Sequence, residues 1–322
     1  MTDRITRFGE RFGRIVSNVE TVIQGKREVV ELVLLALVAE GHVLVEDVPG
    51  VGKTHLAKSV ARSIDGVFSR IQFTPDLLPS DVTGISVYDR DRRAFEFKPG
   101  PIFANIVVGD EINRASPKTQ SALLEAMEER QVTSDGITRP VPTPFMVVAT
   151  QNPLEHEGTY PLPEAQLDRF MMRVVIGYPD RSKELEMLDT HGIRSTFHDL
   201  EPVVSLEEVN DLITTAQHVT VSDPVKNYII DLIGATRQHP DVLLGASPRS
   251  ALFLQRLARA RAAAQGRDFV LPDDIKELAI PVLEHRLSLR PEAQMRGETV
   301  AGVITGILGK LRVPGTASRI AT

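Results

Sequence analysis

The chain has 322 residues, no cysteine and a formal net charge of −6, from 37 basic and 43 acidic side chains. Without cysteine it can form neither disulfides nor thiolate metal sites, and its acidic balance argues against a dedicated nucleic-acid-binding protein. The length suggests two domains and is sufficient to bury more than one hydrophobic core.

The first residues show no sign of a targeting segment. Residues 1–14 are dotted with charge and lack the apolar stretch of a signal peptide. The longest apolar run, residues 29–39, is interrupted by Glu31 and is too short to cross a bilayer, so it predicts a buried helix. We therefore expect no membrane span and a cytoplasmic protein.

Five short apolar segments between residues 22 and 178 predict the buried strands of a parallel sheet. Helical patterns separate most of them, and this alternation is typical of a doubly wound α/β sheet. The strands are expected at His42–Glu46, Phe68–Phe73, Asn105–Asp110, Phe145–Thr150 and Met171–Ile176.

Two insertions between the predicted strands have the pattern of β-hairpins. In the first, apolar residues alternate on both sides of the charged stretch Asp89–Arg93. The second spans Val132–Ile137 around Asp135-Gly136, a dipeptide typical of tight hairpin turns. The hairpins are either surface decoration or contacts for a partner, and the sequence favours neither.

Beyond Tyr178-Pro179-Asp180 helical periodicity dominates and no comparable strand pattern follows. We therefore expect an α/β core over residues 1–180 and an all-helical domain over residues 181–322. One helix is expected to begin at Ser247-Pro248-Arg249, because serine is a good N-cap and proline suits the first turn, and to end at Gly266.

A glycine-rich segment follows the first predicted strand and opens a helix. Such a turn directs backbone N–H groups at one point, where the helix dipole also favours an anion. Lys53 adds a cation for the β- and γ-phosphates of ATP, and the Thr54 hydroxyl can bind Mg²⁺. Asp47 stands where the general pattern has glycine, but the part nearest the phosphates is intact. The predicted nucleotide-binding residues here are Asp47, Val48, Pro49, Gly50, Val51, Gly52, Lys53, Thr54 and His55.

Two carboxylates, Asp110 and Glu111, end the third predicted strand. They would lie at the carboxyl edge of the sheet, where open α/β sheets bind ligands. Asp110 can hold Mg²⁺, and Glu111 can polarise a water for attack on the γ-phosphate. An ordinary solvated strand end could also carry two adjacent carboxylates. The position of Asp110 and Glu111, about fifty residues after a phosphate loop, favours the functional interpretation.

Three further polar residues are candidates for the same chemistry. Asn152 follows the fourth strand and could orient the attacking water, although an Asn-Pro turn explains it equally well. Arg169, in Leu167-Asp168-Arg169-Phe170, could reach the γ-phosphate of a neighbouring subunit or form a helix-end salt bridge. Arg249, in a first helical turn, hints at an anionic partner there, or is simply solvated. The eight histidines show no metal-ligand spacing.

The order of these motifs resembles that of the AAA+ ATPases. The connecting segments are more specific and resemble the MoxR branch of that family. The resemblance runs from about Ile23 to Leu311, and the segments that carry it best are Phe73–Gly84, Gly100–Phe103, Asp110–Ala115 and Glu157–Ala165.

The resemblance implies a P-loop core whose five-stranded parallel sheet has the order 5-1-4-3-2, with helices on both faces and a helical lid behind. By matching position, Asn152 is similar to sensor 1, Arg169 to the arginine finger and Arg249 to sensor 2, which would couple loss of the γ-phosphate to lid rotation. Residues 22–25, including Ile23 and Gly25, resemble the lining of the adenine pocket. Residues 89–93 resemble the helix-2 insert, and residues 132–137 the pre-sensor hairpin.

MoxR proteins are chaperone-like, and they often work with proteins that carry von Willebrand factor A domains. The resemblance implies ATP and Mg²⁺ as cofactors and a homo-oligomer, expected to be a hexameric ring, that acts on client proteins. Two other functions stay open: a nucleic-acid-stimulated motor, and a nucleotide-dependent scaffold or switch without significant turnover. DNA-stimulated hydrolysis would favour the first, and absence of phosphate release the second.

Overall fold

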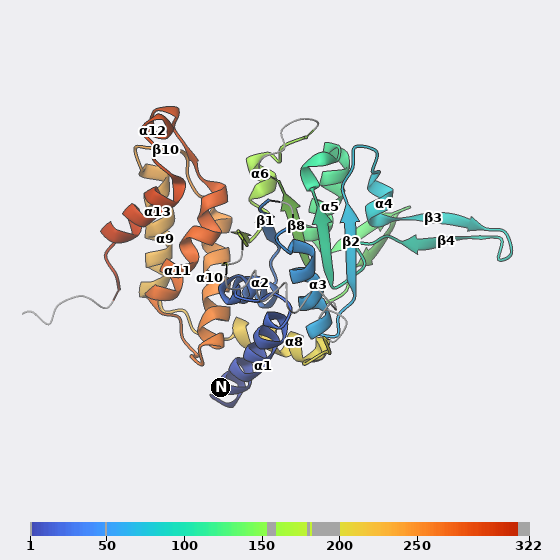
Figure 1. Cartoon of the computed structure of the whole chain (residues 1–322), viewed down its shortest axis with the longest axis horizontal. Coiled ribbons are helices and arrows are strands. Elements are labelled where there is room, and N and C mark those ends of the chain that lie inside the picture. Colours follow the sequence, from blue (N-terminus) through green and yellow to red (C-terminus); the bar gives the residue numbers. More distant parts are fainter. Residues whose placement is uncertain (1, 49, 153–158, 179–180, 182–199, 315–322) are drawn as a thin grey trace, which may run out of the picture.

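The computed structural model describes residues 2–48, 50–152, 159–178, 181 and 200–314. A parallel sheet of five strands lies at the centre of the first half (Figure 1). Its order, β2-β5-β8-β1-β9, is the predicted 5-1-4-3-2 once the five strands are counted along the chain. They are β1 (Val43–Glu46), β2 (Phe68–Gln72), β5 (Ile106–Asp110), β8 (Met146–Gln151) and β9 (Met172–Val174).

Side chains alternate between the two faces of the sheet, and both faces are buried. On β1, Val43 and Val45 belong to one hydrophobic cluster and Leu44 to the other. The first cluster also holds apolar residues of α1 (Thr2–Glu20), α2 (Arg27–Val38) and α3 (Lys53–Ser63), and the second those of α5 (Pro117–Glu129). Helices therefore cover both faces, as predicted for strands that are apolar on both sides.

Both predicted hairpins are present. β3 (Gly84–Asp89) and β4 (Ala94–Pro99) form a long hairpin that projects from the body of the molecule (Figure 1). β6 (Gln131–Ser134) and β7 (Ile137–Pro140) enclose Asp135 and Gly136, both at positive φ as a tight turn requires. The short helices α4 (Pro79–Thr83) and α6 (Glu164–Leu167) and the 3₁₀ turn η1 (Ile112–Arg114) complete this half.

The second half is mostly helical, as expected, but it is not all-helical. Two short strands, β10 (Val242–Leu244) and β11 (Ser288–Leu289), pair antiparallel. They are too short to show an alternating pattern. The helices are α8 (Leu206–Gln217), α9 (Asp223–Gln238), α10 (Pro248–Ala264), α11 (Pro272–Leu283), α12 (Pro291–Met295) and α13 (Val300–Lys310), with the 3₁₀ turn η3 (Glu284–Arg286). The domain boundary at residue 180 falls outside the described residues and stays a proposal.

The sequence analysis assigns no element to residues 2–20, which form the amphipathic helix α1. Its buried face includes Phe8, Phe12 and Ile15. α1 contacts α3 of the first half and α8 and α10 of the second, and Asn18 donates a hydrogen bond to the Ser63 hydroxyl at 3.0 Å. Within the ranges given above, no helix has the length and apolar character needed to span a membrane.

His42 directly precedes β1 and connects it to β8 and α5. Its Nδ1 accepts a hydrogen bond from the Val147 N–H at 3.0 Å, so the neutral ring donates from Nε2 to the Met127 carbonyl, also at 3.0 Å. Burial lowers the pKa of this ring from 6.5 to about 4. His42 is thus a structural residue.

The titration of His42 predicts a loss of stability in acid. Because its folded-state pKa lies below its unfolded value, the stabilisation is present above pH 6.5 and is lost as the pH falls towards 4. Between pH 7 and pH 5 the free energy of unfolding should fall by about 2 kcal/mol more in the wild type than in His42→Gln. Denaturant unfolding of both proteins at the two pH values measures this, and equal pH dependence would contradict it.

Candidate functional site

The phosphate loop lies between β1 and α3, at the carboxyl end of β1. Gly50 and Gly52 have φ angles of 88° and 89°, which side-chain-bearing residues rarely adopt. Gly52 is the N-cap of α3, so the first N–H groups of that helix follow the loop directly. The Lys53 ammonium donates to the carbonyls of Asp47 at 2.7 Å and Val48 at 3.0 Å. Pro49, also predicted here, lies outside the described residues.

Asp110 ends β5 beside the phosphate loop, and its carboxylate is held from both neighbouring strands. Thr150, on β8, donates to Oδ1 at 2.6 Å. Arg70, on β2, donates to Oδ2 from Nη2 at 2.7 Å and from Nε at 3.2 Å. A carboxylate offers about four acceptor positions, two on each oxygen, so Oδ1, which accepts one hydrogen bond, keeps capacity for a cation.

Glu111 follows Asp110 in a left-handed backbone conformation, with φ 56° and ψ 51°. This conformation is strained for a residue other than glycine, and such strain is concentrated at functional sites. The Glu111 N–H donates to the Thr150 hydroxyl at 3.0 Å. Its carboxylate oxygen Oε2 accepts from Gln72 at 2.9 Å and from Arg114 at 2.8 Å. The turn and these contacts place a second carboxylate at the same edge.

One cavity of about 430 Å³ unites these groups. It is lined by Gly50, Gly52, Lys53, Thr54, His55, Arg70, Asp110, Glu111, Thr150 and Asn152. The structure thus brings the phosphate loop, the carboxylate pair and Asn152 to one place, as the strand ends predict. Asn152 is buried, directly after β8.

The cavity suits Mg²⁺ held together with phosphates. It offers hard oxygen ligands, the Thr54 hydroxyl and the Asp110 carboxylate, which this ion prefers. Across the residues described, no cluster of three or more His, Cys, Asp or Glu side chains could form a metal cage of its own. Such a sparse donor set fits Mg²⁺, which is commonly bound by one or two protein groups plus substrate oxygens.

Asp47, predicted to bind nucleotide, turns its side chain away from the cavity. Its Oδ2 accepts from the N–H groups of Ile176 at 2.8 Å and Gly177 at 2.6 Å, and its Oδ1 from that of Val48 at 2.8 Å. Asp47 therefore fixes the start of the loop to the chain beyond β9. This role explains a carboxylate where the general pattern has glycine.

The predicted adenine segment lies against the phosphate loop. The Ile23 side chain is 4.0 Å from the point where a Cβ on Gly52 would stand, and Gly25 has a φ of 71°. A larger residue in place of Gly52 would thus enter the space between Ile23 and the loop. Neither Ile23 nor Val51 lines the cavity, and both pack on the hydrophobic cluster below. Their part in nucleotide binding stays a prediction.

Arg169 and Arg249 lie elsewhere, at the opposite edge of the sheet. Both line a second cavity, of about 250 Å³, together with Gly41 and His42, which precede β1. Because β1 has four residues, its first and last Cα atoms are about 10 Å apart. Glu128 of α5 pairs with both arginines, through Oε2 with Arg169 at 3.1 Å and through Oε1 with Arg249. The structure does not bring either arginine to the phosphate loop of its own chain.

Sequence reasoning missed four residues of the site: Gln72, Arg70, Arg114 and Thr150. Arg70 and Gln72 lie on a predicted strand, and Thr150 ends another. Polar residues near the ends of otherwise apolar strands were the available signal. The contacts of Arg70, Gln72 and Thr150 depend on the register between β2, β5 and β8, which the sequence does not show. Arg114 meets Glu111 within a single turn.

A phosphate loop and a strand-end carboxylate pair that share one cavity, on a 5-1-4-3-2 sheet followed by a helical lid, define an AAA+ ATPase. The comparisons agree. Residues 42–172 match the family described as "ATPase family associated with various cellular activities", and residues 234–307 match the AAA lid domain.

Several known proteins are similar to nearly the whole chain, and they define the branch of the AAA+ family to which it belongs. The Mycobacterium tuberculosis protein named Chaperone MoxR1 is 41% identical over 94% of this chain and 82% of its own length. The uncharacterized protein YeaC of Bacillus subtilis is 50% identical over 96% of each chain. A crystal structure from Cytophaga hutchinsonii, described as a candidate ATPase, superposes with a TM-score of 0.91 at 40% identity over 97% of each chain. The chain belongs to the MoxR family of AAA+ ATPases.

Proposed function

We propose that this chain hydrolyses ATP with Mg²⁺ as a ring-forming assembly, expected to be hexameric, that remodels or matures partner proteins. One observation carries the proposal: Lys53, Thr54, Asp110 and Glu111 line a single cavity. These are the groups that phosphoryl transfer to water requires, because its catalysis consists mainly of positioning and charge stabilisation.

Each group has a defined part in the proposed reaction. Lys53 and the N–H groups at the start of α3 bind the β- and γ-phosphates. Thr54 and Asp110 would hold Mg²⁺, which would offset the negative charge of the phosphates. Glu111 accepts a proton from the attacking water, and Asn152 helps to orient that water. The contacts from Gln72 and Arg114 hold the Glu111 carboxylate at the rim of the cavity.

The position of Arg169 and Arg249 supports an assembly. Both arginines lie at the opposite edge from the phosphate loop of their own chain, and about a third of each side chain is exposed. From there they can serve a nucleotide bound by a second copy of the chain. We propose that both complete a neighbour's site, so that Arg249 senses the γ-phosphate across the interface rather than within its own chain.

Mixing two inactive variants tests this assembly. Arg169→Ala should bind ATP but lower the turnover on the order of a thousandfold, because it no longer completes a neighbour's site. Glu111→Gln keeps its Arg169 but lacks the base. A mixture of the two should regain phosphate release, since the arginine of one variant then serves the intact Glu111 of the other. The readout is phosphate release against mixing ratio.

Two results would contradict this proposal. One is a mixture no more active than its inactive components, although light scattering shows that they co-assemble. The other is a wild-type rate per subunit that stays constant as the protein is diluted to monomers. Arg62→Ala is a matched control for loss of a half-exposed arginine, because Arg62, at the end of α3, contacts the Leu200 carbonyl and Glu201 and lines neither cavity.

The action on partner proteins is supported by the relatives' names. One relative is named a chaperone, and two others, from Methylorubrum extorquens and Paracoccus denitrificans, are named MoxR. The hairpin β3–β4 projects from the body and carries exposed apolar side chains, including Phe95 and Tyr88. We propose that this hairpin contacts client proteins, among them proteins with von Willebrand factor A domains. We also propose that the protein is cytoplasmic.

A further inference from the structure

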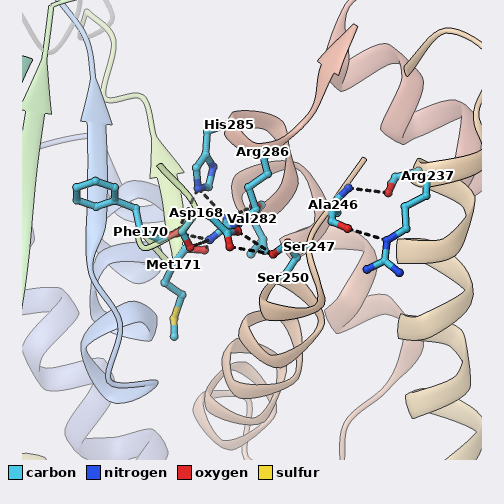
Figure 2. Close-up of polar contacts among 11 residues, drawn as sticks. Asp168, Phe170, Met171, Arg237, Ala246, Ser247, Ser250, Val282, His285 and Arg286 are labelled. Carbon is cyan, nitrogen blue, oxygen red and sulfur yellow. Dashed lines mark hydrogen bonds and ion pairs between the residues drawn. The ribbon is translucent and has the colours of Figure 1, made fainter. Parts of the chain in front are cut away.

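A partly buried joint connects the two segments that carry Arg169 and Arg249. It consists of Asp168, the residue before Arg169, Ser247, the N-cap of α10, and Arg286, the last residue of η3 (Figure 2). We call these three residues the core–lid joint. Neither arginine is anchored to the phosphate loop of its own chain. Glu128 pairs with both guanidinium groups, and the joint holds the two chain segments that carry them.

Arg286 grips the chain on both sides of Arg169. Its Nε donates to Asp168 Oδ1 at 2.9 Å and its Nη2 to the Asp168 carbonyl at 3.2 Å. The same Nη2 also donates to the carbonyl of Phe170, and Nη1 donates to that of Met171 at 3.4 Å. These contacts fix the backbone before and after Arg169, and Figure 2 shows them converging on one guanidinium.

The guanidinium stays charged although it is buried. Its side chain is 2% exposed. Burial lowers the pKa of Arg286 to about 10, and the Asp168 carboxylate opposes this change. The joint therefore contains an ion pair between a buried guanidinium and the partly buried Asp168 carboxylate. Such a pair costs desolvation, and it contributes more clearly to a defined geometry than to stability.

Asp168 extends the joint to the helix of Arg249. The Ser247 hydroxyl donates to the Asp168 carboxylate, 2.9 Å from each oxygen, and makes no capping bond to α10. The preceding residue, Ala246, is anchored to α9 through Arg237 Nε at 2.8 Å and the Thr236 hydroxyl at 3.1 Å. One carboxylate thus fixes both the chain at Arg169 and the first turn of α10, where Arg249 lies.

Glu128 completes the arrangement by spacing the two arginines. Each of its carboxylate oxygens faces one guanidinium. Two guanidinium groups and one carboxylate leave a net charge of +1. The two side chains remain 32% and 35% exposed. The surface that they form can therefore receive an anion from outside the chain.

We propose that the core–lid joint is a positioning device that sets Arg169 and Arg249 as a pair for the nucleotide site of a neighbouring subunit. This proposal rests on the proposed function, in which both arginines act across an interface. It assigns to Asp168, Ser247 and Arg286 a role in hydrolysis by the adjacent subunit. They have no such role in the hydrolysis of ATP bound by their own chain.

Ser247→Ala is the mildest probe of the joint, because it removes one hydroxyl and leaves the ion pair between Asp168 and Arg286 intact. We expect turnover to fall about tenfold or more, since a displacement of about 1 Å can cost a hundredfold. The KM for ATP should change less than twofold, because the cavity at the phosphate loop is at the other edge. Ser247→Thr, which keeps the hydroxyl, should restore turnover. Asp168→Asn is a second variant with a stronger expected loss of turnover, because it removes the carboxylate that contacts both Ser247 and Arg286.

The mixing assay separates positioning from a merely structural role. Ser247→Ala is placed first in the arginine-donating subunit, as Glu111→Gln/Ser247→Ala mixed with Arg169→Ala. It is then placed in the hydrolysing subunit, as Glu111→Gln mixed with Arg169→Ala/Ser247→Ala. Phosphate release should fall in the first mixture and match the parental mixture in the second.

Each outcome decides the matter. An equal loss in both mixtures shows that the joint only supports the fold or the assembly, and overturns the proposal. No loss in either overturns it as well. If the parental mixture of Glu111→Gln and Arg169→Ala does not recover activity, the proposed action across an interface fails, and the role of the joint fails with it.

Discussion

Lys53→Ala is expected to weaken ATP binding by about a hundredfold or more. Lys53 is the cation of the phosphate loop and lines the cavity with Thr54 and Asp110. A hydrogen bond to a charged group contributes up to about 3 kcal/mol, and every 1.4 kcal/mol changes a dissociation constant about tenfold. Titration calorimetry with a slowly hydrolysed ATP analogue and Mg²⁺ measures the affinity directly.

The fold should survive this substitution. Among the described residues, the ammonium donates hydrogen bonds to the carbonyls of Asp47 and Val48, within the loop itself. Lys58→Ala is a matched control, because Lys58 lies on the same helix, is exposed and does not line the cavity. Unchanged ATP affinity in Lys53→Ala, or an equal loss in both variants, would show that the phosphates bind elsewhere.

Glu111→Gln is expected to retain ATP binding and lower the rate of hydrolysis by at least about a hundredfold. The amide has nearly the same shape and can still accept hydrogen bonds from Gln72 and Arg114, but it cannot take a proton from water. General-base catalysis contributes about 10² to 10⁴ in rate. Single-turnover phosphate release, measured beside ATP affinity, separates the two effects.

Glu10→Gln is the control for loss of one carboxylate, because Glu10 is exposed on α1, far along the chain from the cavity. Sustained turnover in Glu111→Gln would refute the assignment of the base. If the assignment holds, the variant remains loaded with ATP. It is then the form best suited to capture a client, and co-purification in the presence and absence of ATP would show which partners bind in a nucleotide-dependent way.

The sequence predicts those parts of the site that depend on local pattern. The spacing of glycines before Lys53 predicts a phosphate loop wherever a strand precedes it and a helix follows. The carboxylates at Asp110 and Glu111 end an apolar strand, and the ends of parallel strands meet at one edge. For this reason the convergence of both motifs on one cavity could be stated in advance, whereas the order of the strands was implied by the resemblance to the AAA+ family.

Contacts between distant segments could not be predicted in the same way. Arg70 meets Asp110 only because β2 pairs with β5 in a particular register. Asp47 binds the N–H groups of Ile176 and Gly177, about 130 residues further along the chain. The placement of Arg249 depends on how the lid docks on the core. The family resemblance assigns Arg249 a role, but it does not say whether Arg249 contacts the nucleotide of its own chain or that of a neighbouring subunit.

The helix α1 has a consequence for how this protein can be divided. Ile5, Phe8 and Ile15 belong to the same hydrophobic cluster as Val43 of the sheet and Leu257 of the lid. A fragment that begins at residue 42 would leave apolar surface of the sheet and of α10 without its cover. The smallest fragment that folds stably is therefore larger than either segment matched by the family comparisons. The helix α1 packs on both segments and holds them together.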